Sequence, residues 1–207
     1  MPEWSTQTEL GQISGTSATL SSNSAPCLAP AGKILVTVGG LAKAINAVNT
    51  IVFKSCGKII GHNTDYIGFK KALEEKYKSN PENALILGSG GASEAIKYVF
   101  KKIGCDFKIV SRFPNKDQLS YDLLSKKIIE NTDIIVNASP IGTYPNIMEA
   151  PNIPYKYLNS KHLLFDLIYN PKETEFLKRG KLYGSKTSNG LKMLKYQADK
   201  SWELWSA

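Results

Sequence analysis

A glycine-rich stretch, "LILGSGGASEAI", is the first part of the sequence whose residue types suggest chemistry. Its glycines follow an aliphatic run and precede an apparent helix start, with Ser93 at the third small position of a dinucleotide fingerprint. Backbone N–H groups without side chains in the way can approach a pyrophosphate at the positive end of a helix. The stretch therefore predicts a dinucleotide-binding loop, with a plain tight turn as the alternative, formed by Gly88, Ser89, Gly90, Gly91 and Ala92.

The segment "FKIVSRFPNK" favours one kind of dinucleotide. NAD sites usually carry an acidic residue about twenty residues after the glycine loop, whereas a 2'-phosphate requires a positive, planar donor. Here the expected strand ends in Ser111 and Arg112, followed by Lys116, with no acid among them. We therefore predict NADP rather than NAD as cofactor; the alternative is that Arg112 is an ordinary surface residue at a strand end.

Aliphatic runs alternate with amphipathic segments after Asp65, and this alternation indicates the elements that must position these residues. "ALILG", "FKIVS", "DIIVNAS" and "HLLFDLIY" read as buried strands. Helices are expected after the glycine loop, over "DLLSKKII", and over residues 173–179 and 191–205. Strands that alternate with helices are typical of a parallel, doubly wound α/β sheet.

The first third of the chain follows another pattern. Residues 1–32 are rich in Ser, Thr, Gly, Ala and Pro and predict a disordered arm. A short strand over residues 34–38 and a helical turn in "LAKAINA" come next, and then a hairpin with strands at 51–53 and 58–60 around Gly57. Asp65 can cap a helix in which Phe69, Leu73 and Tyr77 recur every four residues.

Composition limits the classes of partner. The 207 residues are 42% hydrophobic, and the net charge of +8 comes from lysines scattered over helical segments rather than gathered in one tract. We therefore expect a cytoplasmic protein that binds neither nucleic acid nor membrane. Cys27, Cys56 and Cys105 are widely spaced without nearby histidines, so we expect ordinary thiols and no metal site.

Six segments in order resemble motifs of the shikimate dehydrogenase family: "AINAVNTIV", "IGHNTDYIGF", "LILGSGGAS", "VNASPIGTYPN", "FDLIYNPKETEFL" and "GLKMLKYQADKSWELW". The resemblance covers about residue 41 to the C-terminus. It implies a monomeric or homodimeric enzyme that reduces 3-dehydroshikimate to shikimate with NADPH, in a cleft between a substrate domain and a Rossmann-like cofactor domain. The implied division is 33–80 for an incomplete substrate domain, 81–188 for the NADP domain, and 189–207 for a helix that returns to the substrate domain.

The resemblance also assigns site residues by position. Asp65 matches the catalytic aspartate, and Asn49, Tyr169 and Gln197 match substrate-binding positions. Asn137, Ala138, Gly190 and Met193 match positions near the nicotinamide. Read alone, Asp65 would be a helix cap, Asn49 a turn residue, Gln197 a polar helix residue and Met193 ordinary core; Trp202 and Trp205 read as packing residues.

The sequence departs from the family pattern before residue 41. Two substrate-binding serines and a catalytic lysine of the family have no match here. "ILVTVGG" has Gly39 and Gly40 where the proline of the lysine-bearing motif should follow, and no lysine occurs at the expected offset. Lys33 and Lys43 are the nearest candidates in the sequence for a substitute. We expect a shikimate dehydrogenase impaired as an isolated chain, with a non-catalytic or truncated NADP-binding relative and a quinate-preferring relative as alternatives.

Overall fold

The computed structural model describes residues 36–54, 58–77 and 79–207. The expected arm over residues 1–32, Lys33, the Gly57 turn, Cys27 and Cys56 lie outside the described residues. The expected strand over residues 34–38 is described only from Val36 onward.

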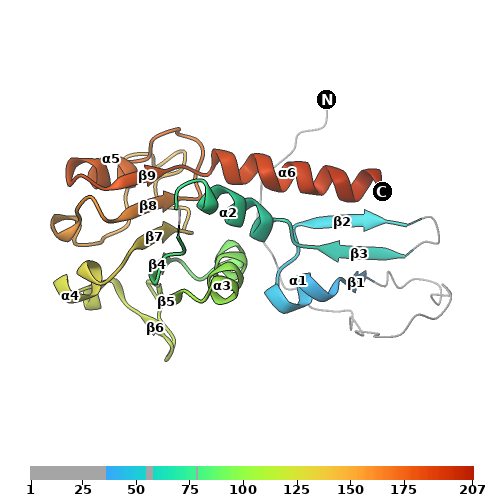
Figure 1. Ribbon diagram of the computed structural model, residues 1–207, viewed down its shortest axis with the longest axis horizontal. Helices are drawn as coiled ribbons and strands as arrows, with labels where there is room; N and C mark the ends of the chain where they lie inside the picture. The colour runs from blue at the N-terminus through green and yellow to red at the C-terminus, as the bar shows by residue number, and fades with distance from the viewer. Residues whose placement is uncertain (1–35, 55–57, 78) are drawn as a thin grey trace.

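A six-stranded parallel sheet holds the larger part of the described chain (Figure 1). Its order is β6-β5-β4-β7-β8-β9, so the chain runs outward in one direction from β4 and then in the other. This confirms the predicted doubly wound α/β fold. The strands are β4 (Asn83–Leu87), β5 (Asp106–Val110), β6 (Gln118–Leu119), β7 (Ile134–Asn137), β8 (Leu163–Asp166) and β9 (Lys186–Ser188).

Helices cover both faces of this sheet because successive residues of each buried strand point to opposite faces. Ile86 of β4 packs in one core with Phe69 and Phe100, while its neighbour Leu85 packs in a second core with Phe176. The first core is covered by α2 (Asp65–Glu74), α3 (Gly91–Ile103) and the start of α6 (Leu191–Ser206). The second is covered by α4 (Lys126–Glu130), α5 (Glu175–Leu182) and the 3-10 turns η1 (Tyr121–Leu123) and η2 (Tyr155–Tyr157).

A separate three-stranded sheet contains β1 (Val36–Val38), β2 (Thr50–Phe53) and β3 (Ile59–His62), in the order β1-β3-β2. β2 and β3 pair antiparallel, which confirms the predicted hairpin, and α1 (Gly40–Ile45) precedes them. Figure 1 shows α2 and α6 connecting the two sheets, with the C-terminal half of α6 beside β2.

Three predicted elements beyond the glycine loop are shorter than expected, among them the strand over "DIIVNAS", which covers only Ile134–Asn137. The helix expected over "DLLSKKII" begins only at Lys126, because Ser125 caps it by accepting a hydrogen bond from the N–H of Ile128. The strand expected over "HLLFDLIY" ends at Asp166, whose carboxylate accepts the N–H of Ile168 and turns the chain. β6 and β9 were not predicted because they are two or three residues long and largely polar.

Single residues also differ from their predicted structural roles. The residue at the cap of α2 is Thr64, so Asp65 is the first residue of the helix rather than its cap, and the helix ends at Glu74, before Tyr77. Trp202 and Trp205 are 70% and 57% exposed, so their interpretation as packing residues was wrong. Both lie near the end of the long C-terminal helix, and the indole N–H of Trp205 donates a hydrogen bond to the carbonyl oxygen of Ile51 in β2.

Candidate cofactor and substrate site

Loops gather at the carboxyl edge of the six-stranded sheet because all of its strands run in the same direction. Ligands of doubly wound folds bind at this edge, near the point where the strand order reverses. Here that point lies between β4 and its neighbours β5 and β7. The loops after β4, β5, β7, β8 and β9 contain residues 88–91, 111–116, 138–142, 167–170 and 189–190. The predicted cofactor residues lie in these loops or beside them, in the first turn of the next helix or at the end of a strand.

The glycine loop is shaped for a group that approaches its backbone closely. Gly88 has a φ of +114°, and a Cβ at this position would lie 2.9 Å from the carbonyl oxygen of Ala138, so only glycine fits. Around Gly90, by contrast, a Cβ would meet nothing within 4 Å. The first turn of α3 follows this open space, and it is the positive end of the helix. The loop therefore fits the pyrophosphate of a dinucleotide.

Ser93 locks the loop instead of facing a ligand. Its side chain is fully buried, and its hydroxyl donates a hydrogen bond of 2.6 Å to the carbonyl oxygen of Gly90. Its backbone N–H donates to the same oxygen at 2.9 Å. The serine at the third fingerprint position thus holds the turn that begins α3.

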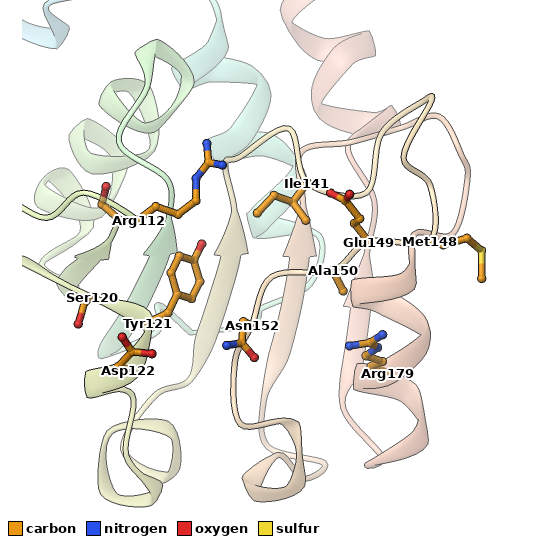
Figure 2. Close-up of a pocket in the computed structure, with 11 residues that line it drawn as sticks. Arg112, Ser120, Tyr121, Asp122, Ile141, Met148, Glu149, Ala150, Asn152 and Arg179 are labelled. Carbon is orange, nitrogen blue, oxygen red and sulfur yellow. The ribbon is translucent and has the colours of Figure 1, made fainter.

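Arg112 lies at the rim of a cavity of about 520 Å³ beside the loop after β5 (Figure 2). Tyr121, Asn152 and Arg179 also line the cavity, and Tyr121 lies below Arg112. Burial raises the pKa of Tyr121, while the nearby charge of Arg112 opposes that rise. None of the ion pairs within the described part of the chain uses Arg112, so its guanidinium is available to an anion. Lys116 is exposed on the same loop but does not line the cavity.

Three predicted substrate and catalytic residues meet, although they are far apart in the sequence. The side-chain nitrogen of Asn49 donates to a carboxylate oxygen of Asp65 at 2.8 Å and to the side-chain oxygen of Gln197 at 3.3 Å. Asn49 precedes β2, Asp65 begins α2, and Gln197 lies in α6. Tyr169, half-exposed in the loop after β8, forms no hydrogen bond with these residues in the described structure.

A cluster of buried hydroxyl groups lies under this site and was not predicted from the sequence. The side-chain oxygen of Asn49 accepts from the N–H of Thr64 at 2.8 Å and from the hydroxyl of Thr50 at 3.1 Å. These bonds turn the NH₂ group of Asn49 toward Asp65. Ser201 joins the two threonine hydroxyls, at 2.8 Å from Thr50 and 3.0 Å from Thr64. Their positions in the sequence could have identified these residues. Both threonines adjoin predicted site residues, and Ser201 follows Gln197 by one helical turn.

Asp65 is half-buried, and its surroundings shift its pKa upward. Burial raises its pKa, and the hydrogen bond from Asn49 opposes this only in part. No ion pair with Asp65 is present among residues 36–54, 58–77 and 79–207. Lys43 is exposed on α1, and Lys33 lies outside the described residues. Within the described chain, the carboxylate of Asp65 accepts a hydrogen bond from the amide of Asn49 and forms no ion pair.

The residues expected near a nicotinamide are held tightly. A Cβ on Gly190 would lie 1.9 Å from the carbonyl oxygen of Leu167, so glycine is required where α6 meets the loop after β8. Met193 is buried in the core between sheet and helices. Asn137 is fully buried, and its amide already has partners. The structure shows packing and loop support for these residues, and their part in binding stays a prediction.

Comparisons with known proteins find shikimate dehydrogenases among the relatives of this chain. The chain is 43% identical over 180 residues to a shikimate dehydrogenase (NADP(+)) of Methanococcus maripaludis, covering 80% of this chain and 64% of that protein. It is 39% identical over 194 residues to the same enzyme of Methanococcus vannielii, covering 84% and 67%. The chain belongs to the shikimate dehydrogenase family. It spans about two thirds of the length of these relatives, and no family model matches it.

Solved structures agree with this assignment to the shikimate dehydrogenase family. A shikimate dehydrogenase in complex with NADP+ superposes with a TM-score of 0.72 at 36% identity, over 82% of this chain and 64% of that one. A quinate dehydrogenase of Corynebacterium glutamicum in complex with NAD gives 0.71 at 25% identity, over 81% and 65%. Among the described residues, no helix has the length and apolar character needed to cross a membrane.

Proposed function

We propose that the chain binds NADP and the substrate pair shikimate and 3-dehydroshikimate, and that its own capacity for turnover is low. The observation that carries this proposal is the meeting of Asn49, Asp65 and Gln197 beside the helices that lead to the carboxyl edge of the six-stranded sheet. A polyol needs hydrogen-bond donors and acceptors close together, and an amide next to a carboxylate offers both.

The cofactor residues are proposed by position and chemistry. The backbone of Gly88, Ser89, Gly90, Gly91 and Ala92 would hold the pyrophosphate, and Arg112, with Ser111 and Lys116, the 2'-phosphate. Residues Asn137, Ala138, Gly190 and Met193 would line the nicotinamide side. When bound, the reduced cofactor would supply a hydride. The relatives support NADP because their names specify it.

The substrate site is proposed to be only partly complete. Reduction of a ketone leaves an alkoxide that must receive a proton from a positioned acid or from water. Asp65 and Asn49 would position the hydroxyl groups of the substrate, with Gln197 and Tyr169 nearby. Asp65 has no cationic partner within the described residues, and loss of a positioned acid lowers rates by roughly a hundredfold to ten-thousandfold.

The division of the chain follows the same proposal. Residues 33–80 would form an incomplete substrate domain, 81–188 the NADP domain, and 189–207 the helix that returns to the substrate domain. The contacts of α6 with both α2 and β2 support this division. We propose a monomer or homodimer in the cytoplasm.

Two alternatives have specific support. A non-catalytic NADP-binding protein is favoured by the absence of a cation beside Asp65 among the described residues. A quinate dehydrogenase is favoured by the structural similarity to the enzyme of Corynebacterium glutamicum.

A binding titration followed by a steady-state assay tests the proposal. We expect the purified chain to bind NADPH and to oxidise shikimate very slowly with NADP+, and Asp65→Ala to abolish that residual rate. Binding without turnover selects the non-catalytic alternative, and faster turnover of quinate selects the quinate enzyme. Robust turnover abolished by Lys33→Ala or Lys43→Ala would show that one of these lysines supplies the proton, which contradicts the low-turnover proposal.

A further inference from the structure

A buried polar cluster of Asn137, Asp166 and Thr174 lies under two loops of the carboxyl edge. All three residues are 0% exposed. The side-chain nitrogen of Asn137 donates to one carboxylate oxygen of Asp166 at 3.1 Å, and the hydroxyl of Thr174 donates to the other. We call these residues the Asp166 cluster. It joins the ends of β7 and β8 to the start of α5.

The Asp166 cluster also holds the backbone of both neighbouring loops. Asp166 accepts the N–H of Ile168 at 3.0 Å, in the loop after β8. The amide nitrogen of Asn137 donates to the carbonyl oxygen of Ile141 at 3.2 Å, and its oxygen accepts the N–H and hydroxyl of Ser139, in the loop after β7. The Asp166 carboxylate is therefore bonded directly to the loop at 167–171 and, through the side chain of Asn137, to the loop at 138–142.

These loops in turn contact the rest of the proposed site. The backbone of the loop after β7 packs closely against Gly88, where a Cβ would lie 2.9 Å from the carbonyl oxygen of Ala138. The backbone of the loop after β8 packs closely against Gly190, whose N–H donates to the carbonyl oxygen of Ile168 at 3.0 Å. A shift of either loop would therefore reach the glycine loop or the beginning of α6.

We propose that Asp166 and Thr174 are positioning residues for the nicotinamide half of the cofactor, acting through the loops at 138–142 and 167–171. The inference rests on the proposed function, because it assumes that NADP binds at this edge. Neither side chain is expected to touch the cofactor, since both are buried. A buried cluster whose polar atoms all have partners fixes geometry more strongly than a solvated one, because an unmade bond in it is costly.

The main test compares binding of the whole cofactor with binding of its adenosine half. Thr174→Val keeps the shape of the side chain and removes the hydroxyl that donates to Asp166. At pH 8 we expect NADPH to bind about tenfold more weakly, the loss expected from one broken hydrogen bond to a charged group. Binding of 2'-phospho-ADP, which lacks the nicotinamide, should change less than twofold, and Thr174→Ser should restore NADPH binding.

Thr132→Val is the matched control. Thr132 is also buried, and its hydroxyl donates at 2.8 Å to the carbonyl oxygen of Ile128, but it lies before β7, at the opposite edge of the sheet. It also loses a buried hydroxyl hydrogen bond, in this case to a backbone carbonyl oxygen, without touching the Asp166 cluster. We expect the Thr132 variant to lose stability and to bind both ligands as the wild type does. Weakening of both ligands by Thr174→Val, or of neither, would overturn the inference.

Amide hydrogen exchange provides a readout that needs no ligand. In Thr174→Val and Asp166→Asn, the backbone amides of residues 138, 139, 141, 142 and 167–170 should exchange about tenfold faster than in the wild type, and those of α3 should be unchanged. Asp166→Asn serves if the valine variant does not fold. Exchange that is unchanged in these loops would refute the coupling itself. If exchange in the variants shows this coupling but the wild-type chain binds neither NADPH nor 2'-phospho-ADP, the proposed function is refuted, and the positioning role with it.

Discussion

Arg112 is the residue that we expect to distinguish NADPH from NADH, through the 2'-phosphate. It is exposed beside an open cavity and makes no ion pair within the described part of the chain. We predict that Arg112→Asp weakens NADPH by about 1–3 kcal/mol, because a charge-assisted contact to the 2'-phosphate is lost, and leaves NADH nearly unchanged. Fluorescence titration with both cofactors measures the difference.

The control for this prediction is Lys108→Asp, an exposed residue of β5 whose replacement changes the net charge equally. It should affect NADPH by less than a factor of about two, through long-range charge alone. If Arg112→Asp weakened NADPH and NADH to the same extent, Arg112 would have no part in recognising the 2'-phosphate.

Asp166 gives the stability of the protein a pH dependence. Burial raises its pKa from the usual 3.8 to about 6, against the hydrogen bonds from Thr174, Ile168 and Asn137. The folded chain therefore holds a proton that the unfolded chain releases between about pH 4 and pH 6, and stability falls as the pH rises through this window. A shift of about two pKa units corresponds to about 3 kcal/mol.

Asp166→Asn should remove this slope. The hydrogen bonds lost by the variant cost the same at every pH, so we expect the difference in unfolding free energy, variant minus wild type, to grow by up to about 3 kcal/mol from pH 4 to pH 7. Urea denaturation at each pH measures it, with Asp117→Asn on an exposed loop as control. A constant difference across this range would disprove the titration of Asp166.

At the scale of the elements, the contact between α2 and α6 holds the substrate residues together. A Cβ on Gly68 would lie 2.5 Å from the carbonyl oxygen of Met193 and 3.1 Å from the Cβ of Gln197, so Gly68→Ala must push the helices apart. We predict a loss of about 1–3 kcal/mol in unfolding free energy, typical of overpacking. Because Gln197 lies at the contact, affinity for shikimate should fall as well.

Gly40→Ala is the matched variant for this test. A Cβ on Gly40, the first residue of α1, would meet nothing within 4 Å. Alanine is a better helix former than glycine, so Gly40→Ala should stabilise the chain, by less than about 1 kcal/mol. Equal stability changes for the two variants in urea denaturation would show that the helices do not meet closely at Gly68.

For the whole molecule, cofactor binding should appear as added stability. A ligand that binds only the folded chain adds about 2.7 kcal/mol at a concentration one hundred times its dissociation constant. For a chain of this size that corresponds to roughly 5–10 °C in Tm. We predict this shift with NADPH and a clearly smaller one with NADH at the same concentration, measured by thermal denaturation. Equal shifts would remove the preference for NADP.

The sequence by itself determined the parts that depend on local pattern. The glycine loop, the strands on either side of it and the amphipathic α3 follow from residue types and hydrophobic periodicity within a few turns of chain. Asn49 and Asp65 were identified because each lies in a short segment that resembles a family motif. These features need no knowledge of what packs against them.

Only the tertiary structure decided which distant side chains meet. Ser201 contacts Thr64 across 137 positions, and Asp166 contacts Asn137 across 29, and no local period marks either pair. The same holds for Trp202, which was assigned to packing but is exposed, whereas its neighbour Ser201 is buried against β2. Hydrogen bonds and burial depend on the direction in which whole elements approach each other, and the sequence of one element does not contain that direction.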